Sequence, residues 1–158
     1  MKAVESPTIF SCPVTAAGKQ LNRKDDREMN LTQLVFCRES VDPDFVTLQL
    51  GLIPTESLRV GDETTIGGKP GFLSRVGLWK LSLPNESGER TIEEQLVQWT
   101  RLLQSRVQVL RELREAGYAP YLDCQAERGS QSLCIDPVVL AALGALSVSL
   151  SIWLYEGQ

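Results

Sequence analysis

The residues of this chain that could carry out acid–base chemistry are carboxylates, because the sequence contains no histidine. Histidine is the commonest general base, the usual partner of a serine or cysteine nucleophile, and the commonest metal ligand. Asp123 and Glu127 have the spacing to share one face of a strand, and Asp62 and Glu63 adjoin a glycine. Paired acids can bind a hard cation or hydrolyse a glycosidic bond. We expect these pairs to be solvated surface carboxylates, and we assign no catalytic residue, cofactor or metal site.

The glycine-rich segment of residues 67–71 contains a lysine and superficially resembles a phosphate-binding loop. The P-loop pattern requires a glycine five positions before its second glycine, but Glu63 stands there. It also requires a serine or threonine after the lysine to hold magnesium, but Pro70 stands there. We therefore expect residues 67–71 to be a loop, a glycine-rich turn between two strands.

Three aromatic residues, Tyr121, Trp153 and Tyr155, are the candidate partner-binding residues. Residues 148–155 alternate, so that aliphatic side chains face one way while Trp153, Tyr155 and two serines face the other. We expect Tyr121 on a neighbouring strand. If this face is open, the aromatic residues form a recognition patch, because Trp and Tyr provide rigid contact area with a polar group. If helices or the N-terminal residues cover the face, these side chains belong to the core.

Helices and strands alternate around these residues. Asp42-Pro43 and Asp136-Pro137 each predict a helix start, because Asp caps the first turn and Pro fits the first helical position. Phe45, Leu48 and Leu52 predict the apolar side of the first of these helices. A capping box at Thr91 and a run of apolar residues at steps of three or four predict one long helix that ends at Gly117.

Strands are predicted at residues 34–37, 76–83, 118–127 and 148–155, and residues 132–135 form a further strand if the chain turns back after residue 127. We expect an α+β fold with a mostly antiparallel sheet of four to six strands and helices packed on one face. The long central helix between strand–helix–strand units indicates split β-α-β (ferredoxin-like) character.

Size and charge favour one domain and exclude some partners. The chain has 158 residues, of which 42% are hydrophobic, which is enough for one core. A net charge of −4 lacks the positive field that nucleic acids and anionic membranes require, so we expect neither partner. No apolar run approaches the roughly 18–20 residues of a membrane span. Residues 1–30 show no sustained period and are expected to be an extension, flexible or lying over a single domain of residues 31–158.

The four cysteines are Cys12, Cys37, Cys124 and Cys134, and none of them forms a C-x-x-C pair. Zinc sites usually pair ligands two to four residues apart, so no zinc site is expected. A disulfide between Cys124 and Cys134 requires neighbouring strands. We expect buried free thiols in a reducing compartment, and hence a cytoplasmic location.

Several short motifs occur together over about residues 33–156. They are Asp42-Pro43, residues 50–56 with Gly61 shortly after, Gly77-Leu78-Trp79, the long helix, Asp136-Pro137 and a last strand that ends in Tyr155. In these motifs the chain resembles a family of small uncharacterised bacterial proteins, catalogued as domain of unknown function family 4279. The resemblance implies a compact α+β cytoplasmic domain without an assigned reaction.

We expect an uncharacterised, non-enzymatic protein-binding domain. By analogy with other small acidic domains, its narrower form is an immunity-type inhibitor of a bacterial toxin. An alternative is a small-molecule or nucleotide-sensing domain with a pocket near residues 67–71. The third hypothesis is a carboxylate-based hydrolase that uses Asp123 and Glu127.

Overall fold

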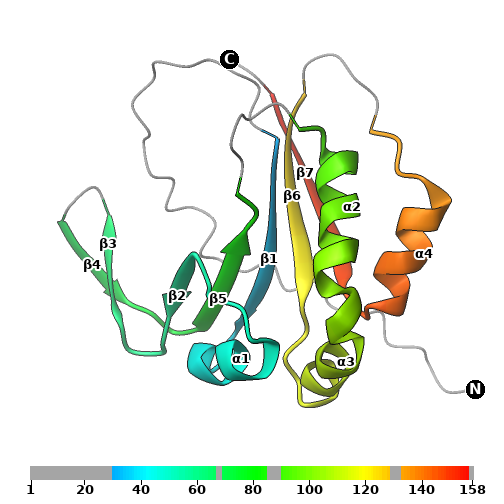
Figure 1. Cartoon of the computed structure of the whole chain (residues 1–158). Coiled ribbons are helices and arrows are strands. Elements are labelled where there is room, and N and C mark those ends of the chain that lie inside the picture. The colour runs from blue at the N-terminus through cyan, green and yellow to red at the C-terminus, as the bar shows by residue number, and fades with distance from the viewer. Residues whose placement is uncertain (1–29, 67–68, 85–89, 129–132, 157–158) are drawn as a thin grey trace, which may run out of the picture.

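Figure 1 shows the computed structural model of the chain, which describes residues 30–66, 69–84, 90–128 and 133–156. These residues form an α+β fold, as the sequence predicted. The elements follow one another as β1 (Leu31–Arg38), α1 (Pro43–Leu50), β2 (Glu56–Leu58), β3 (Glu63–Ile66), β4 (Lys69–Leu73), β5 (Gly77–Ser82), α2 (Ile92–Leu103), the 3-10 turn η2 (Gln104–Arg106), α3 (Val107–Glu115), β6 (Tyr121–Arg128), α4 (Pro137–Ala145) and β7 (Ser149–Glu156). The predicted extension of residues 1–30 falls almost wholly outside the described ranges.

Five strands form one sheet in the order β2-β5-β1-β6-β7. The central strand β1 pairs antiparallel with both β5 and β6, and β2 pairs antiparallel with β5. Because β5 and β6 are both antiparallel to β1, they are parallel to each other, and the segment from α2 to α3 connects them. This is the predicted split β-α-β arrangement within a mostly antiparallel sheet.

The last two strands of the sheet, β6 and β7, run parallel. The sequence had suggested that β6 turns back into a strand at residues 132–135. That prediction is wrong, because residues 133–135 form no strand and residue 132 lies outside the described ranges. Instead, α4 carries the chain back along the sheet, since parallel neighbours require a crossover connection. This leaves β7 as the outermost strand.

β3 and β4 form a separate two-stranded antiparallel sheet. The segment of residues 67–71 was predicted as a glycine-rich turn between two strands, and paired strands do lie on either side of residues 67–68, which are outside the described ranges. The prediction is wrong for residues 69–71, which belong to β4. Gly71 permits the close approach of the two strands, because a Cβ at this position would lie 2.4 Å from the carbonyl oxygen of Thr64. The glycine is therefore explained by strand pairing.

The helices pack on one face of the five-stranded sheet (Figure 1). Alternate strand residues point towards them. The core under the helices contains the fully buried side chains Leu34, Phe36, Trp79, Leu122, Leu96, Trp99 and Leu103. Phe36 and Trp79 face each other across β1 and β5 in an edge-to-face contact with ring centroids 5.5 Å apart.

The long helical segment predicted from the capping box at Thr91 is present from Ile92 to Glu115. The turn η2 divides it into α2 and α3, whose axes differ in direction (Figure 1). Arg106 satisfies carbonyl groups at this bend, because its Nε donates to Leu50 O at 2.8 Å and its Nη1 donates to Leu102 O at 2.8 Å. None of the helices in the described ranges is both long and apolar enough to cross a lipid bilayer.

Both Asp-Pro pairs start helices as predicted. Asp42 Oδ1 accepts from the backbone N–H of Asp44 at 3.0 Å, and Asp136 Oδ1 accepts from the backbone N–H of Val138 at 2.7 Å. The predicted apolar side of α1 is wrong for Phe45 and Leu48, whereas Leu52, which follows the helix, packs against the core. The buried residues of the helix are Pro43, Val46 and Leu50, whereas Phe45 and Leu48 are exposed.

The prediction of four buried free thiols is only partly correct. Cys124 is buried and free, whereas Cys134 is free but exposed, so these two cysteines do not form a disulfide with each other. Cys37 is disulfide-bonded. Cys12 lies outside the described ranges. The argument from free thiols for a reducing compartment therefore no longer holds.

Candidate functional site

The face of the sheet opposite the helices carries the candidate residues, and we call it the helix-free face, with reference to the described part of the chain. The register between neighbouring strands determines which residues lie side by side on this face. Tyr121 of β6 lies beside Ser149 of β7, Asp123 lies beside Ser151, and Gln125 lies beside Trp153. Each pair points to the same side, because neighbouring strands of a sheet share their pleat.

The three predicted partner-binding residues lie on neighbouring strands but do not form one cluster. Trp153 is four positions further along its strand than the residue beside Tyr121, which separates the two aromatic residues by about 13 Å. Tyr121 is half-buried, and burial together with the charge of Asp123 raises its pKa to about 12. Trp153 is 43% exposed. Tyr155 continues β7 beside Glu127, and the structure describes only its backbone.

β7 is an edge strand whose outer side has no neighbour among the described residues. Edge strands are normally protected from further pairing by charged residues, proline or a bulge. From Ser149 to Tyr155 the strand has no charge and no proline, and its register with β6 runs without a shift. Ile152, Trp153 and Leu154 are consecutive and exposed. Among the described residues, the outer edge of β7 is therefore not paired and could form backbone hydrogen bonds with an extended chain.

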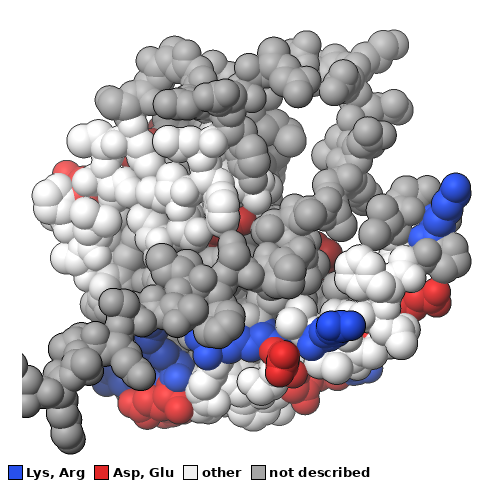
Figure 2. All heavy atoms as spheres, turned by 180° about the vertical axis from the view of Figure 1, so that it is seen from behind, with Lys and Arg blue, Asp and Glu red and all other residues white. Residues whose placement is uncertain are grey.

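Helix α4 extends the uncharged character of this edge. No charged residue occurs between Pro137 and Tyr155, although charged residues make up 23% of the chain. Val138 is 75% exposed and Leu140 is also exposed. We use the name α4–β7 surface for the exposed apolar residues of these two elements, which are Val138, Leu140, Ile152, Trp153 and Leu154. In Figure 2 the described atoms on the side of the molecule that carries α4 and β7 are largely white, while the charged side chains gather along the lower border.

Asp123 is buried, with 3% of its surface exposed, so the prediction of a solvated carboxylate is wrong for this residue. Its Oδ2 accepts a 3.0 Å hydrogen bond from Gln125 Nε2, whereas its Oδ1 has no hydrogen-bond partner. Lys80 lies two strands away on the same face, but its ammonium group pairs with Glu56. The charge of Asp123 also contributes, after burial, to raising the pKa of Cys124 to about 12.

Asp123 and Glu127 share a strand face, as predicted, but they are four positions apart, which is about 13 Å along β6. The carboxyl groups of glycosidases lie about 5–9.5 Å apart. No group of three or more acidic, cysteine or histidine side chains that could hold a metal ion occurs within the described ranges. Because the side chain of Glu127 lies outside the described part of the structure, the hydrolase hypothesis stays a prediction.

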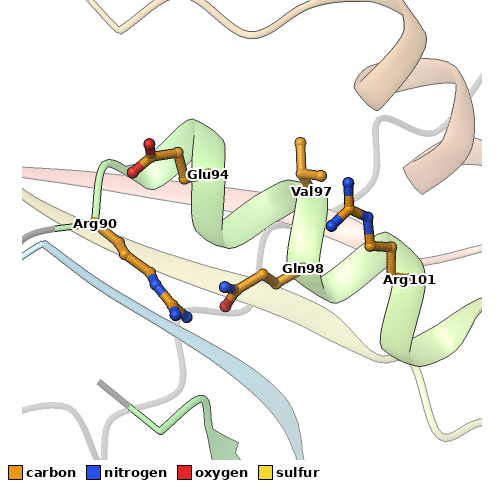
Figure 3. Close-up of a pocket in the computed structure, with 5 residues that line it drawn as sticks. All are labelled: Arg90, Glu94, Val97, Gln98 and Arg101. Carbon is orange, nitrogen blue, oxygen red and sulfur yellow. The ribbon is translucent and has the colours of Figure 1, made fainter. Parts of the chain in front are cut away.

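The described residues also line a hollow on α2, formed by Arg90, Glu94, Val97, Gln98 and Arg101 (Figure 3). Figure 3 shows these side chains spreading to different sides of the helix rather than converging on one point. Glu94 is already engaged, because its Oε2 accepts from the backbone N–H of Thr91 in the capping box. A ligand pocket requires polar groups that converge, so this hollow is a poor candidate. The pocket predicted beside residues 67–71 falls partly outside the described ranges and stays a prediction.

Fold and site together define a small α+β domain in which the edge strand β7 has no outer neighbour among the described residues and no charged residue from Ser149 to Tyr155. Residues 27–157 match the model of the family described as "Domain of unknown function (DUF4279)". The match covers most of the chain, so the protein belongs to this family, as the resemblance of its motifs predicted. Neither the comparison with curated proteins nor the comparison with solved structures found a match.

Two features of the site were not found by sequence reasoning. The burial of Asp123 left no signal in the sequence, because a lone acid on a strand is equally compatible with solvent. The uncharged stretch from Pro137 to Tyr155 was visible in the sequence. Depletion of charged residues is typical of the centres of protein interfaces, so this stretch is the signal that could have indicated a binding surface.

Proposed function

We propose that this protein is a non-enzymatic protein-binding domain that pairs an extended segment of its partner with the outer edge of β7. The observation that carries the proposal is the unprotected edge of β7 beside the exposed apolar side chains of the α4–β7 surface. In this mode of recognition, backbone hydrogen bonds to the edge strand provide affinity, and pockets for alternate side chains provide specificity.

The side chains around the edge fit this mode. Trp153 on the helix-free face and Ile152 on the helix-covered face stand on opposite sides of β7, so both sides of an added strand meet apolar surface. Tryptophan is among the residues that most often dominate binding energy.

The proposal is tested by introducing a charged residue on β7 and measuring peptide binding. Random peptides long enough to pair along β7 are displayed on phage and selected against the intact protein. We expect Trp153→Lys to weaken the selected peptides by about tenfold or more, because a charge on the edge must be desolvated on pairing. Phe72→Lys is the matched control, because Phe72 is an exposed aromatic on β4, outside the α4–β7 surface. Hydrogen exchange of the β7 amides should slow when peptide binds.

Selected peptides that bind equally well to both lysine variants and leave the β7 amides unprotected would contradict the proposal. Near-ultraviolet circular dichroism of the buried Trp79 and Trp99 verifies that each variant is folded.

An immunity-type inhibitor of a bacterial toxin is the narrower form of the proposal. Its support is the small size of the domain, its net charge of −4 and the open binding edge. The experiment is co-expression with a toxin encoded by an adjacent gene, in which the natural chain restores growth and Trp153→Lys does not. Growth that neither chain restores speaks against an immunity role. The cytoplasmic location stays a prediction, and the disulfide at Cys37 argues against it.

A further inference from the structure

On the helix-free face, a single small residue lies between Asp123 and the outer edge of β7. Asp123 on β6 lies beside Ser151 on β7, and Ser151 has no further strand outside it among the described residues. Along β7, the residues on the same face to either side are Ser149 and Trp153. The carboxylate is therefore one strand in from the edge at which the partner is proposed to pair.

Oδ1 of Asp123 needs a hydrogen-bond donor that the described chain does not supply. The residue is 3% exposed and Oδ1 has no partner, while Oδ2 is satisfied by Gln125. A buried acceptor without a partner destabilises the folded state, and an unpaired buried charge destabilises it more. The two ion pairs in the described ranges, Arg59 with Asp44 and Lys80 with Glu56, leave Asp123 without a cation.

A strand added to β7 would bring a side chain within reach of this oxygen. Neighbouring strands are about 4.8 Å apart, so the residue opposite Ser151 would stand about 10 Å from the backbone of Asp123. The long stems of lysine and arginine can lie along apolar surface while the charged group reaches past it. Ser151 is the only residue of β7 beside Asp123 and has a short side chain, and Trp153 lies two positions further along the same face.

We infer that the partner segment carries a lysine or arginine at the position opposite Ser151, and that its charged group donates to Oδ1 of Asp123. This inference rests on the proposed function, because it requires a strand on the edge of β7. The residues next to this cation in the partner are uncharged, since the surface from Pro137 to Tyr155 offers no other charge to pair with them. The partner is thus an extended, largely apolar segment with one basic side chain.

The test compares peptides selected on the natural protein with peptides selected on Asp123→Asn, a change that removes the charge and keeps the shape. We expect the first set to be enriched in one lysine or arginine at a fixed position, and the second set to lack that enrichment. One selected peptide is then synthesised with its basic residue and with norleucine in its place. The basic peptide should bind the natural protein about tenfold or more tightly than the norleucine peptide, and Asp123→Asn should abolish this difference.

Ser151→Leu provides a second variant, which keeps the carboxylate and places a bulkier side chain between it and the outer edge of β7. We expect this variant to reduce the preference for the basic peptide while the norleucine peptide still binds. Peptides that protect the β7 amides but show no preference for a basic residue would overturn this inference and leave the proposed function intact. Peptides that leave the β7 amides unprotected would overturn both.

Discussion

The indole Nε1 of Trp99 donates a 2.8 Å hydrogen bond to the hydroxyl oxygen of Thr32, and both residues are fully buried. The contact joins α2 to the central strand β1. The Thr32 hydroxyl in turn donates to Gln95 Oε1 at 2.7 Å, and the Thr32 backbone N–H donates to the same oxygen at 3.1 Å. Leaving buried polar groups of such a network unpaired costs free energy, so the network fixes the position of α2 on the sheet.

Thr32→Val tests this network. The change keeps the shape of the side chain but removes the hydroxyl group, which leaves the Trp99 N–H without its acceptor. We expect the free energy of unfolding to fall by about 1–3 kcal/mol, measured by urea denaturation. Thr32→Ser retains the hydroxyl group and should cost less than Thr32→Val. A valine variant as stable as the natural protein would show that the network contributes nothing to stability.

Gly77 is required by the close approach of β5 to Val41. A Cβ added at Gly77 would lie 1.8 Å from the carbonyl oxygen of Val41, so the backbone would have to move. We expect Gly77→Ala to lower the free energy of unfolding by about 1–3 kcal/mol or more. The control is Gly144→Ala on α4, where nothing lies within 4 Å, and this change should stabilise the helix by about 0.5–1 kcal/mol. Equal effects of the two changes would contradict the crowding at Gly77.

The phenol of Tyr121 should make the free energy of unfolding depend on pH in the alkaline range. Burial, followed by the charge of Asp123, raises the pKa of this phenol from 10.0 to about 12. Because the folded state holds this proton more tightly than the unfolded state, the contribution is present below pH 10 and is lost as the pH rises towards 12. Denaturant unfolding of the natural protein across this window should show a steeper loss than Tyr121→Phe, which has no phenol to titrate. Identical slopes would contradict the raised pKa.

The free thiols of Cys124 and Cys134 should differ in reactivity. Burial, together with the charge of Asp123, raises the pKa of Cys124 to about 12, while Cys134 is exposed. The thiolate is the reactive form, so at pH 8 a thiol reagent should modify Cys134 and spare Cys124 until denaturant is added. Mass spectrometry of the labelled peptides measures both sites. Rapid labelling of Cys124 in the folded protein would show that the strand opens more readily than its burial indicates.

The sequence by itself determined those structural elements that depend on interactions between residues only a few positions apart. Asp42 and Asp136 cap helices through backbone N–H groups two residues ahead, and the capping box at Thr91 closes over three residues. The short motifs along the chain identified the family for the same reason, because each is a local pattern.

Only the tertiary structure decided the features that depend on partners far apart in the chain. The parallel pairing of β7 with β6, rather than a return strand at residues 132–135, followed from which sheet edge remained free. The burial of Val46 instead of Phe45 depends on where α1 meets the sheet, and the burial of Asp123 depends on what surrounds β6. Burial and pairing are set by contacts across the fold, whereas caps and strand alternation are set by the backbone next to each residue.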